Sequence, residues 1–245
     1  MSVVEHHSPE IDPSGENAGI QAPERAPLPV YSIVLIVCYS AVFAAQLYAG
    51  LEQSVYLAGD DKQAFLAGEY WRMLTGSALH GGLLHYAMNT FALYSFGKIF
   101  EIMSARAHLP IVFLLSAIGG AILSLVVNPV GISVGASGGI VGVVGYLVVY
   151  SFKRKEFVTA EFRRGLIFNI GFILLYGFVL VGTIDNSAHV GGLLTGAAYA
   201  LIQVPPDSYS DPRVSSDAVS IAGLVSAGVY AATCVFAVLV IMGVV

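Results

Sequence analysis

Seven stretches of the chain are almost continuously apolar, and short polar segments separate them. Each is close to the roughly 20 residues that a helix needs to cross the hydrocarbon core of a bilayer. A backbone in lipid must satisfy its own hydrogen bonds, and no ten-residue alternating strands occur, so all of these stretches are predicted to be helices. The predicted spans are 31–50, 83–100, 109–127, 137–152, 165–182, 188–204 and 219–245.

Composition agrees with this pattern, because 56% of the residues are hydrophobic and only 11% are charged, against about 25% charged in an ordinary soluble domain. The sequence therefore predicts an all-α polytopic membrane protein embedded in a lipid bilayer. No basic run interleaved with aromatic residues indicates nucleic acid as a partner. Cys38 and Cys234 lie inside apolar stretches at opposite ends of the chain, so we interpret them as small buried hydrophobes and not as a disulfide or metal pair.

Polar segments divide the chain into four parts. Residues 1–29 are rich in Pro, Glu and Ser and lack an apolar core, so they are predicted to be a disordered tail and not a signal peptide. Residues 30–204 hold six spans, residues 205–218 form a linker, and residues 219–245 form a seventh span.

Lysine and arginine residues gather on one side of the predicted membrane. Only Lys62 and Arg72 are assigned to the other side. The positive-inside rule makes the crowded side cytoplasmic, together with the N-terminus. We therefore expect a multi-pass protein of a plasma membrane or a bacterial inner membrane. The charges that set this orientation are Lys98 and Arg106 between spans two and three, and Lys153, Arg154, Lys155, Arg163 and Arg164 between spans four and five.

Spans two, four and six all run from outside to inside, and each carries polar residues in its first turns. These residues are His85 and Asn89, then Ser137, then His189. Because a helix rises 1.5 Å per residue, these residues all lie in the outer part of the membrane. Polar side chains inside a membrane are costly, so we interpret these residues as candidates for a functional site. Stripes of small residues on spans four and six permit close approach of the two helices. The stripes are Gly138, Gly142 and Gly145 on span four, and Gly192 and Gly196 beside His189 on span six.

These residue types point to acyl-transfer chemistry. A serine hydroxyl becomes a nucleophile when a base takes its proton, and a neutral histidine is the usual base near pH 7. Ser137 and His189 are therefore a candidate dyad. His85, Asn89 and the backbone N–H groups at the start of span four are candidate donors to an oxyanion. Asp185 lies one turn before His189 and could act as a third, acidic partner, although an Asp just ahead of a helix is more often solvated or an N-cap residue.

Other interpretations of the same residues stay open at this point. A metal or haem site could use His80, His85 and His189, but no carboxylate or thiolate joins them. A transporter would also place polar residues in interrupted helices, yet no inverted repeat is apparent. His80, five residues before His85, is interpreted as a structural residue that anchors the loop ahead of span two.

From about residue 29 to residue 204, the motifs resemble those of the rhomboid family of intramembrane serine proteases. They occur in the family's order along the chain, and together they are highly specific. They are Trp71-Arg72 in the first outer loop, His80-x4-His85-x3-Asn89 entering span two, Gly135-Ala-Ser137-Gly138 opening span four, and Ala188-His189-x2-Gly192-x3-Gly196 on span six.

The resemblance implies a six-helix core with one added C-terminal helix. It implies a peptidase without a cofactor, whose substrates are transmembrane segments cut near the outer face. Ser137 would be the nucleophile, His189 the general base, and His85 and Asn89 part of the oxyanion site. Trp71, Arg72 and Glu101 would have structural roles. The alternative is a catalytically silent relative that binds membrane clients.

One position departs from the family pattern. The family usually has Tyr or Phe four residues after the nucleophile, stacked against the catalytic histidine, whereas this chain has Val141. An aliphatic side chain can still pack the ring but restrains its orientation less. This difference bears on the catalytic rate more than on which residues are catalytic.

Overall fold

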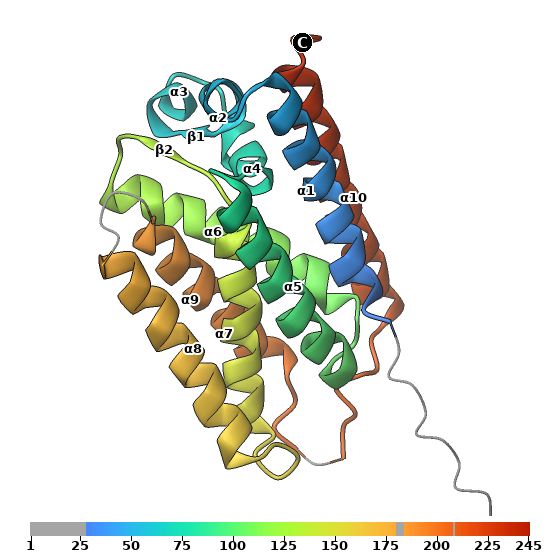
Figure 1. The fold of residues 1–245 in the computed structure, drawn as a ribbon. Helices are drawn as coiled ribbons and strands as arrows, with labels where there is room; N and C mark the ends of the chain where they lie inside the picture. Colours follow the sequence, from blue (N-terminus) through green and yellow to red (C-terminus); the bar gives the residue numbers. More distant parts are fainter. Residues whose placement is uncertain (1–27, 180–183, 208) are drawn as a thin grey trace, which may run out of the picture.

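The computed structural model describes residues 28–179, 184–207 and 209–245. The fold is an all-α polytopic membrane fold in which long helices form a bundle and short elements gather at one end (Figure 1). The long helices of the described residues are α1 (Val30–Ala49), α5 (Leu83–Met103), α6 (His108–Val127), α7 (Ser137–Lys153), α8 (Ala160–Val179), α9 (Asn186–Gln203) and α10 (Asp217–Ile241).

Each predicted span coincides with one of these helices. Within the described residues, α1, α6, α8 and α10 are long and apolar enough to cross a membrane by length and composition, and α7 is a shorter apolar helix. The predicted tail lies outside the described residues except for residues 28–29, as do the last three residues of the fifth predicted span.

Several helix ends differ from the predicted ends. The helix α8 begins at Ala160, five residues before the predicted start, and α5 continues to Met103. Both extensions carry charged residues, because hydropathy marks the part of a helix that lies in lipid while hydrogen bonding continues beyond it. The helix α10 ends at Ile241, four residues before the predicted end, and Gly243 beyond it adopts a φ of +67° that favours glycine.

The segment between α1 and α5, residues 50–82, is called the first loop. It folds into α2 (Leu51–Ala58), β1 (Asp60–Asp61), α3 (Lys62–Leu66), α4 (Arg72–Thr75) and the 3-10 helix η1 (Gly76–Ala78). The strand β1 pairs antiparallel with β2 (Ile132–Ser133), and Asp60 lies opposite Ser133. These elements lie together at one end of the bundle, which is called the first-loop end (Figure 1).

Glycine residues bring α6, α7 and α9 into close contact. A Cβ atom on Gly192 of α9 would lie 2.1 Å from the carbonyl oxygen of Gly138 on α7. A Cβ atom on Gly196 would lie 1.9 Å from the carbonyl oxygen of Gly142. Because any larger residue would clash with backbone atoms, only glycine permits this approach of α7 and α9.

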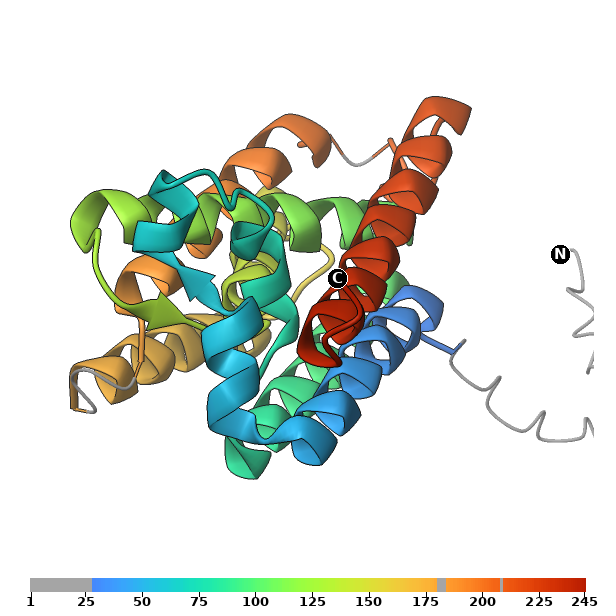
Figure 2. The same cartoon turned by 90° about the horizontal axis from the view of Figure 1, so that it is seen from above.

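The last helix, α10, packs beside α1, as the two views in Figures 1 and 2 show. The thiols of Cys38 and Cys234, 196 positions apart in the chain, interact with each other across this contact, and both cysteines are free. The phenol of Tyr230 donates to the carbonyl oxygen of Ser77 in η1 at 3.2 Å. The helix α10 therefore contacts the first loop as well as α1.

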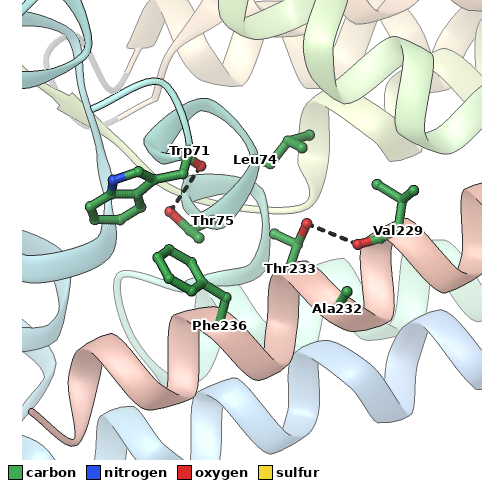
Figure 3. Close-up of a pocket in the computed structure, with 7 residues that line it drawn as sticks. All are labelled: Trp71, Leu74, Thr75, Val229, Ala232, Thr233 and Phe236. Atoms are coloured by element: carbon green, nitrogen blue, oxygen red, sulfur yellow. Dashed lines mark hydrogen bonds between the residues drawn. The ribbon is translucent and has the colours of Figure 1, made fainter. Parts of the chain in front are cut away.

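A shallow apolar pocket of about 320 Å³ lies between α4 and α10 (Figure 3). On its rim the rings of Trp71 and Phe236 meet edge to face, with their centroids 5.3 Å apart. The hydroxyls of Thr75 and Thr233 are occupied by the carbonyl oxygens of Ala58 and Val229. The contact between the first loop and α10 is therefore mainly apolar.

Candidate active site

Ser137 is the first residue of α7 and is half-buried near the first-loop end. Gly135, two residues earlier, has a φ of +129°, a conformation that L side chains rarely adopt. Its N–H donates to the carbonyl oxygen of Gly76 in η1 at 2.9 Å. The turn into α7 is therefore held by the first loop. The strand β2 precedes this turn, but it is two residues long and antiparallel, unlike the strand of a soluble hydrolase elbow.

His189 lies in the first turn of α9, and its ring reaches Ser137. The distance from His189 Nε2 to Ser137 Oγ is 2.8 Å, which is a hydrogen bond. The histidine is 7% exposed. Its Nδ1 atom is buried and has no hydrogen-bond partner among the described residues. The two side chains therefore meet as a pair, and Asp185 is not bonded to the ring as a third member.

His85 and Asn89 occupy successive turns of α5. His85 Nδ1 accepts the N–H of Gly81 at 3.3 Å, so the neutral ring carries its proton on Nε2. A Cβ atom on Gly135 would lie 2.8 Å from His85 Nε2 and 3.7 Å from Ser137 Oγ, so both groups border the same space at Gly135. The amide of Asn89 donates to the carbonyl oxygen of His85 at 3.1 Å, and the Asn89 side chain is buried.

His80 precedes α5 and ties the end of the first loop to α1. Its N–H donates to Gln46 Oε1 at 2.9 Å, and Gln46 Nε2 donates back to its carbonyl oxygen at 3.1 Å. The fully buried ring packs against Tyr39 and Tyr86, with centroids 5.1 and 5.5 Å away. In the described part of the chain, no three or more His, Cys, Asp or Glu side chains gather in a way that could hold a metal ion.

Glu101 lies at the opposite end of α5 and holds the start of α1. Its Oε1 atom accepts the N–H and the hydroxyl of Ser32 at 2.8 and 2.7 Å. Its Oε2 atom accepts the N–H of Tyr31 at 3.3 Å. Because the first N–H groups of a helix have no intrahelical acceptor, this carboxylate caps α1 from a neighbouring helix.

Arg72 links separate parts of the first loop. Its guanidinium Nη1 donates to the carbonyl oxygens of Tyr56 and Gly59 at 3.0 and 3.2 Å, and Nε pairs with Glu69 at 2.6 Å. The guanidinium carbon also lies 4.8 Å from the centre of the Trp71 ring. Arg72 and Trp71 therefore connect α2, α4 and, through the Trp71 ring, α10.

Asp185 is the N-cap of α9, where its Oδ1 atom accepts the N–H of Ala188 at 3.0 Å. Its Oδ2 atom accepts the hydroxyls of Ser124 and Ser133 and faces the ammonium of Lys62 at 3.4 Å. Burial alone would raise the pKa of Asp185, but these donors and the Lys62 charge hold it below its usual value. The capping position of Asp185 was predictable from the sequence, whereas the three partners of its Oδ2 atom were not. The one sign of them was that Lys62 departs from the positive-inside pattern.

Val141 lies one turn after Ser137 on α7 and is buried at 2% exposure. The long helices thus form a bundle in which a serine hydroxyl meets a histidine ring near one end. The Rhomboid domain profile matches residues 67–206, more than half of the chain. The chain therefore belongs to the rhomboid family.

Three similar proteins show how far the likeness extends. Rhomboid protease GluP of Bacillus subtilis is 37% identical over 152 residues, which are 61% of this chain and 30% of that protein. RHOMBOID-like protein 6, mitochondrial, of Arabidopsis thaliana is 31% identical over 159 residues, 64% of this chain and 52% of that protein. RHOMBOID-like protein 4 of the same plant is 34% identical over 145 residues, 56% and 35% of the two chains. The chain thus matches between about a third and a half of the length of these relatives.

Proposed function

We propose that this protein is an intramembrane serine endopeptidase that cleaves transmembrane segments of other membrane proteins. The observation that carries the proposal is the hydrogen bond between Ser137 Oγ and His189 Nε2 at 2.8 Å. A hydroxyl within this distance of an imidazole nitrogen can transfer its proton as it attacks a carbonyl carbon. The named rhomboid protease among the relatives supports the same reaction class.

In the proposed reaction, His189 takes the proton of Ser137 while Oγ attacks the carbonyl carbon of the scissile peptide bond. His189 then gives that proton to the departing amine, leaving an acyl group on Ser137. Water, activated by His189, attacks this ester, and the serine is regenerated with release of the acid. Without a partner on Nδ1 among the described residues, the ring is oriented by its packing and by Ser137 itself.

The negative charge of each tetrahedral intermediate needs preorganised donors. His85 Nε2–H borders the space beside Gly135 that Ser137 Oγ also borders, which suits an oxyanion bound there. The first N–H groups of α7 have no intrahelical acceptor and supply further donors at the same place. Asn89 supports His85 through its bond to the His85 carbonyl, and a rotation of its amide would add another donor.

Orientation follows from the distribution of positive charges. Lysine and arginine residues crowd the end of the bundle opposite the first loop, which we assign to the cytoplasm together with the N-terminus. The first-loop end then faces outward, and water reaches the half-buried Ser137 from that side. A helical peptide bond offers a poorly accessible carbonyl, so substrates carry helix-weakening Gly or Pro near the cut.

Cleavage of a transmembrane substrate in proteoliposomes tests the proposal. The wild-type protein should cut a substrate whose helix contains Gly or Pro in its outer half, and Ser137→Ala and His189→Ala should not. Normal cleavage by either variant would contradict the dyad. Equal cleavage of stable and weakened helices would contradict the unwinding requirement. A protein that binds the substrate but never cuts it would support the alternative, a catalytically silent relative that holds membrane clients.

A further inference from the structure

The carboxylate of Asp185 connects four elements of the fold. It caps α9 through Ala188, and it accepts hydrogen bonds from Ser124 at the end of α6 and Ser133 of β2. The fourth partner is Lys62 at the start of α3 in the first loop. None of these contacts involves the side chains of the dyad.

The backbone links this cluster to both residues of the dyad, His189 and Ser137. The carbonyl oxygen of Asp185 accepts the N–H of His189 at 3.2 Å, so the position of Asp185 fixes the turn that carries the histidine. Ser133 lies four residues before Ser137, on the strand that leads into α7. Its hydroxyl accepts from Lys62 Nζ at 2.9 Å and donates to Asp185 Oδ2 at 2.6 Å.

The two charged groups of this cluster, Lys62 and Asp185, are both largely buried, and Lys62 is the more buried of the two. The Lys62 side chain is 3% exposed and the Asp185 side chain 23% exposed. An ammonium buried to this extent is stable only when it keeps an anionic partner, because its loss leaves an uncompensated charge. Lys62 also lies beside Asp60, whose carboxyl is buried. Burying the Lys62–Asp185 ion pair costs desolvation free energy. In return, the pair holds the first loop against the start of α9 in one arrangement.

We propose that Lys62 and Asp185 are positioning residues for the dyad, an inference that rests on the proposed function. The pair joins the first loop to the start of α9 and, through Ser133, to the strand ahead of Ser137. It thereby keeps His189 Nε2 within hydrogen-bond reach of Ser137 Oγ. Neither residue touches the reacting atoms, so their effect on the reaction passes through the placement of the two helix starts.

The test uses the full chain in detergent and measures three quantities for each variant. These are the rate of labelling by a fluorophosphonate, kcat and KM for a transmembrane substrate, and the midpoint of thermal unfolding. Asp185→Asn keeps a capping side chain but removes the charge, and Lys62→Met removes the ammonium while keeping the length of the stem. The labelling rate reports on the dyad independently of substrate docking.

Each single variant should lower the labelling rate and kcat by about 10- to 100-fold, because a displacement near 1 Å at a reacting group has an effect of this size. KM should change less than about twofold, since the substrate contacts remain. The double variant should be no slower than the slower single variant, because the two residues act as one unit. Lys62→Arg should recover most of the rate.

Lys153→Met is the matched control. Lys153, the last residue of α7, donates from Nζ to the carbonyl oxygens of Leu201 and Val204 at the opposite end of α9, so this variant removes a lysine that contacts the same helix far from the dyad. Its labelling rate should equal that of the wild type even if the unfolding midpoint falls. Where Asp185→Asn fails to fold, Ser133→Ala removes only the bridging hydroxyl and should give a smaller loss in the same quantities.

The outcomes separate this proposal from the proposed function. A wild-type protein that is labelled at Ser137, with variants labelled at the same rate while folded, would overturn the positioning role alone. Variants that lose only thermal stability would overturn it equally. A wild-type protein that is not labelled at Ser137 would overturn both proposals.

Discussion

Replacing Gly192 by alanine tests the geometry of the dyad without changing any group that takes part in the chemistry. A Cβ atom at this position would lie 2.1 Å from the carbonyl oxygen of Gly138, whereas ordinary contact begins at 3.4 Å. The oxygen belongs to a helix backbone that cannot rotate away, so α7 and α9 must separate locally by about 1.3 Å. Gly138 follows Ser137 directly, and Gly192 is three residues after His189. The displacement therefore acts on the dyad itself.

The magnitude follows from the observed distance. Adding about 1 Å to the 2.8 Å between Ser137 Oγ and His189 Nε2 takes the pair beyond hydrogen-bond range. We expect kcat to fall about 100-fold, which is about 2.7 kcal/mol in the activation free energy. The assay is cleavage of a transmembrane substrate, measured together with the rate of fluorophosphonate labelling at a temperature where the variant is folded.

Gly171→Ala on α8 is the control for this experiment, because a Cβ atom there meets nothing within 4 Å. It introduces the same methyl group into a helix of the same protein and should leave both rates unchanged. If folded Gly192→Ala retained a kcat within threefold of the wild type, the close approach of α7 and α9 would not be what sets the dyad distance, and the reasoning would be refuted.

Three further predictions concern other parts of the site and fold. Asn89→Ala should lower kcat by about 10²–10³-fold, as expected when an oxyanion-site donor is removed, and leave measurable activity. An unchanged kcat would exclude Asn89 from the oxyanion site. Burial raises the pKa of Asp60 to about 6 against the opposing charge of Lys62, so the stabilising neutral form is present below about pH 4 and lost as pH rises through 6. Relative to the wild type, Asp60→Asn should therefore gain on the order of 2 kcal/mol in unfolding free energy between pH 4 and pH 8, seen as a rising difference in unfolding midpoint; a constant difference would contradict this. Mercuric ion should bridge Cys38 and Cys234, so that a protease cut introduced in residues 205–216 leaves the two fragments joined, and fragments that separate would contradict the packing of α10 on α1.

The long helices were predictable because each contains a long apolar stretch. Among the described residues, α1, α6, α8 and α10 are long and apolar enough to cross a membrane by length and composition. Their ends were less so. The start of α8 at Ala160 precedes its apolar stretch, since a helix continues for as long as its backbone hydrogen bonds are favourable. The end of α10 at Ile241 depends on the conformation of Gly243, which hydropathy does not report. The shared depth of Ser137 and His189 was predictable from rise per residue and from the direction of each span.

The first loop was not predictable in the same way. Its elements are short, and contacts with distant segments determine their structure. The strand β1 forms by pairing with β2, which is more than 70 positions away in the sequence. The contact between Lys62 and Asp185 spans 123 positions. Neither pairing leaves a periodic pattern in the sequence. The capping role of Asp185 is local and could be anticipated, whereas its bonds to Lys62 and Ser133 required the tertiary structure.

The proposed function requires Ser137 to be a nucleophile that His189 activates. The most direct measurement is labelling of the detergent-solubilised protein with a fluorescent fluorophosphonate, which reacts with an activated serine. The wild type should be labelled, and the label should map to Ser137. Ser137→Ala and His189→Ala should not be labelled although both are folded. Labelling that persists in Ser137→Ala, or a folded wild type that takes up no label, would contradict it.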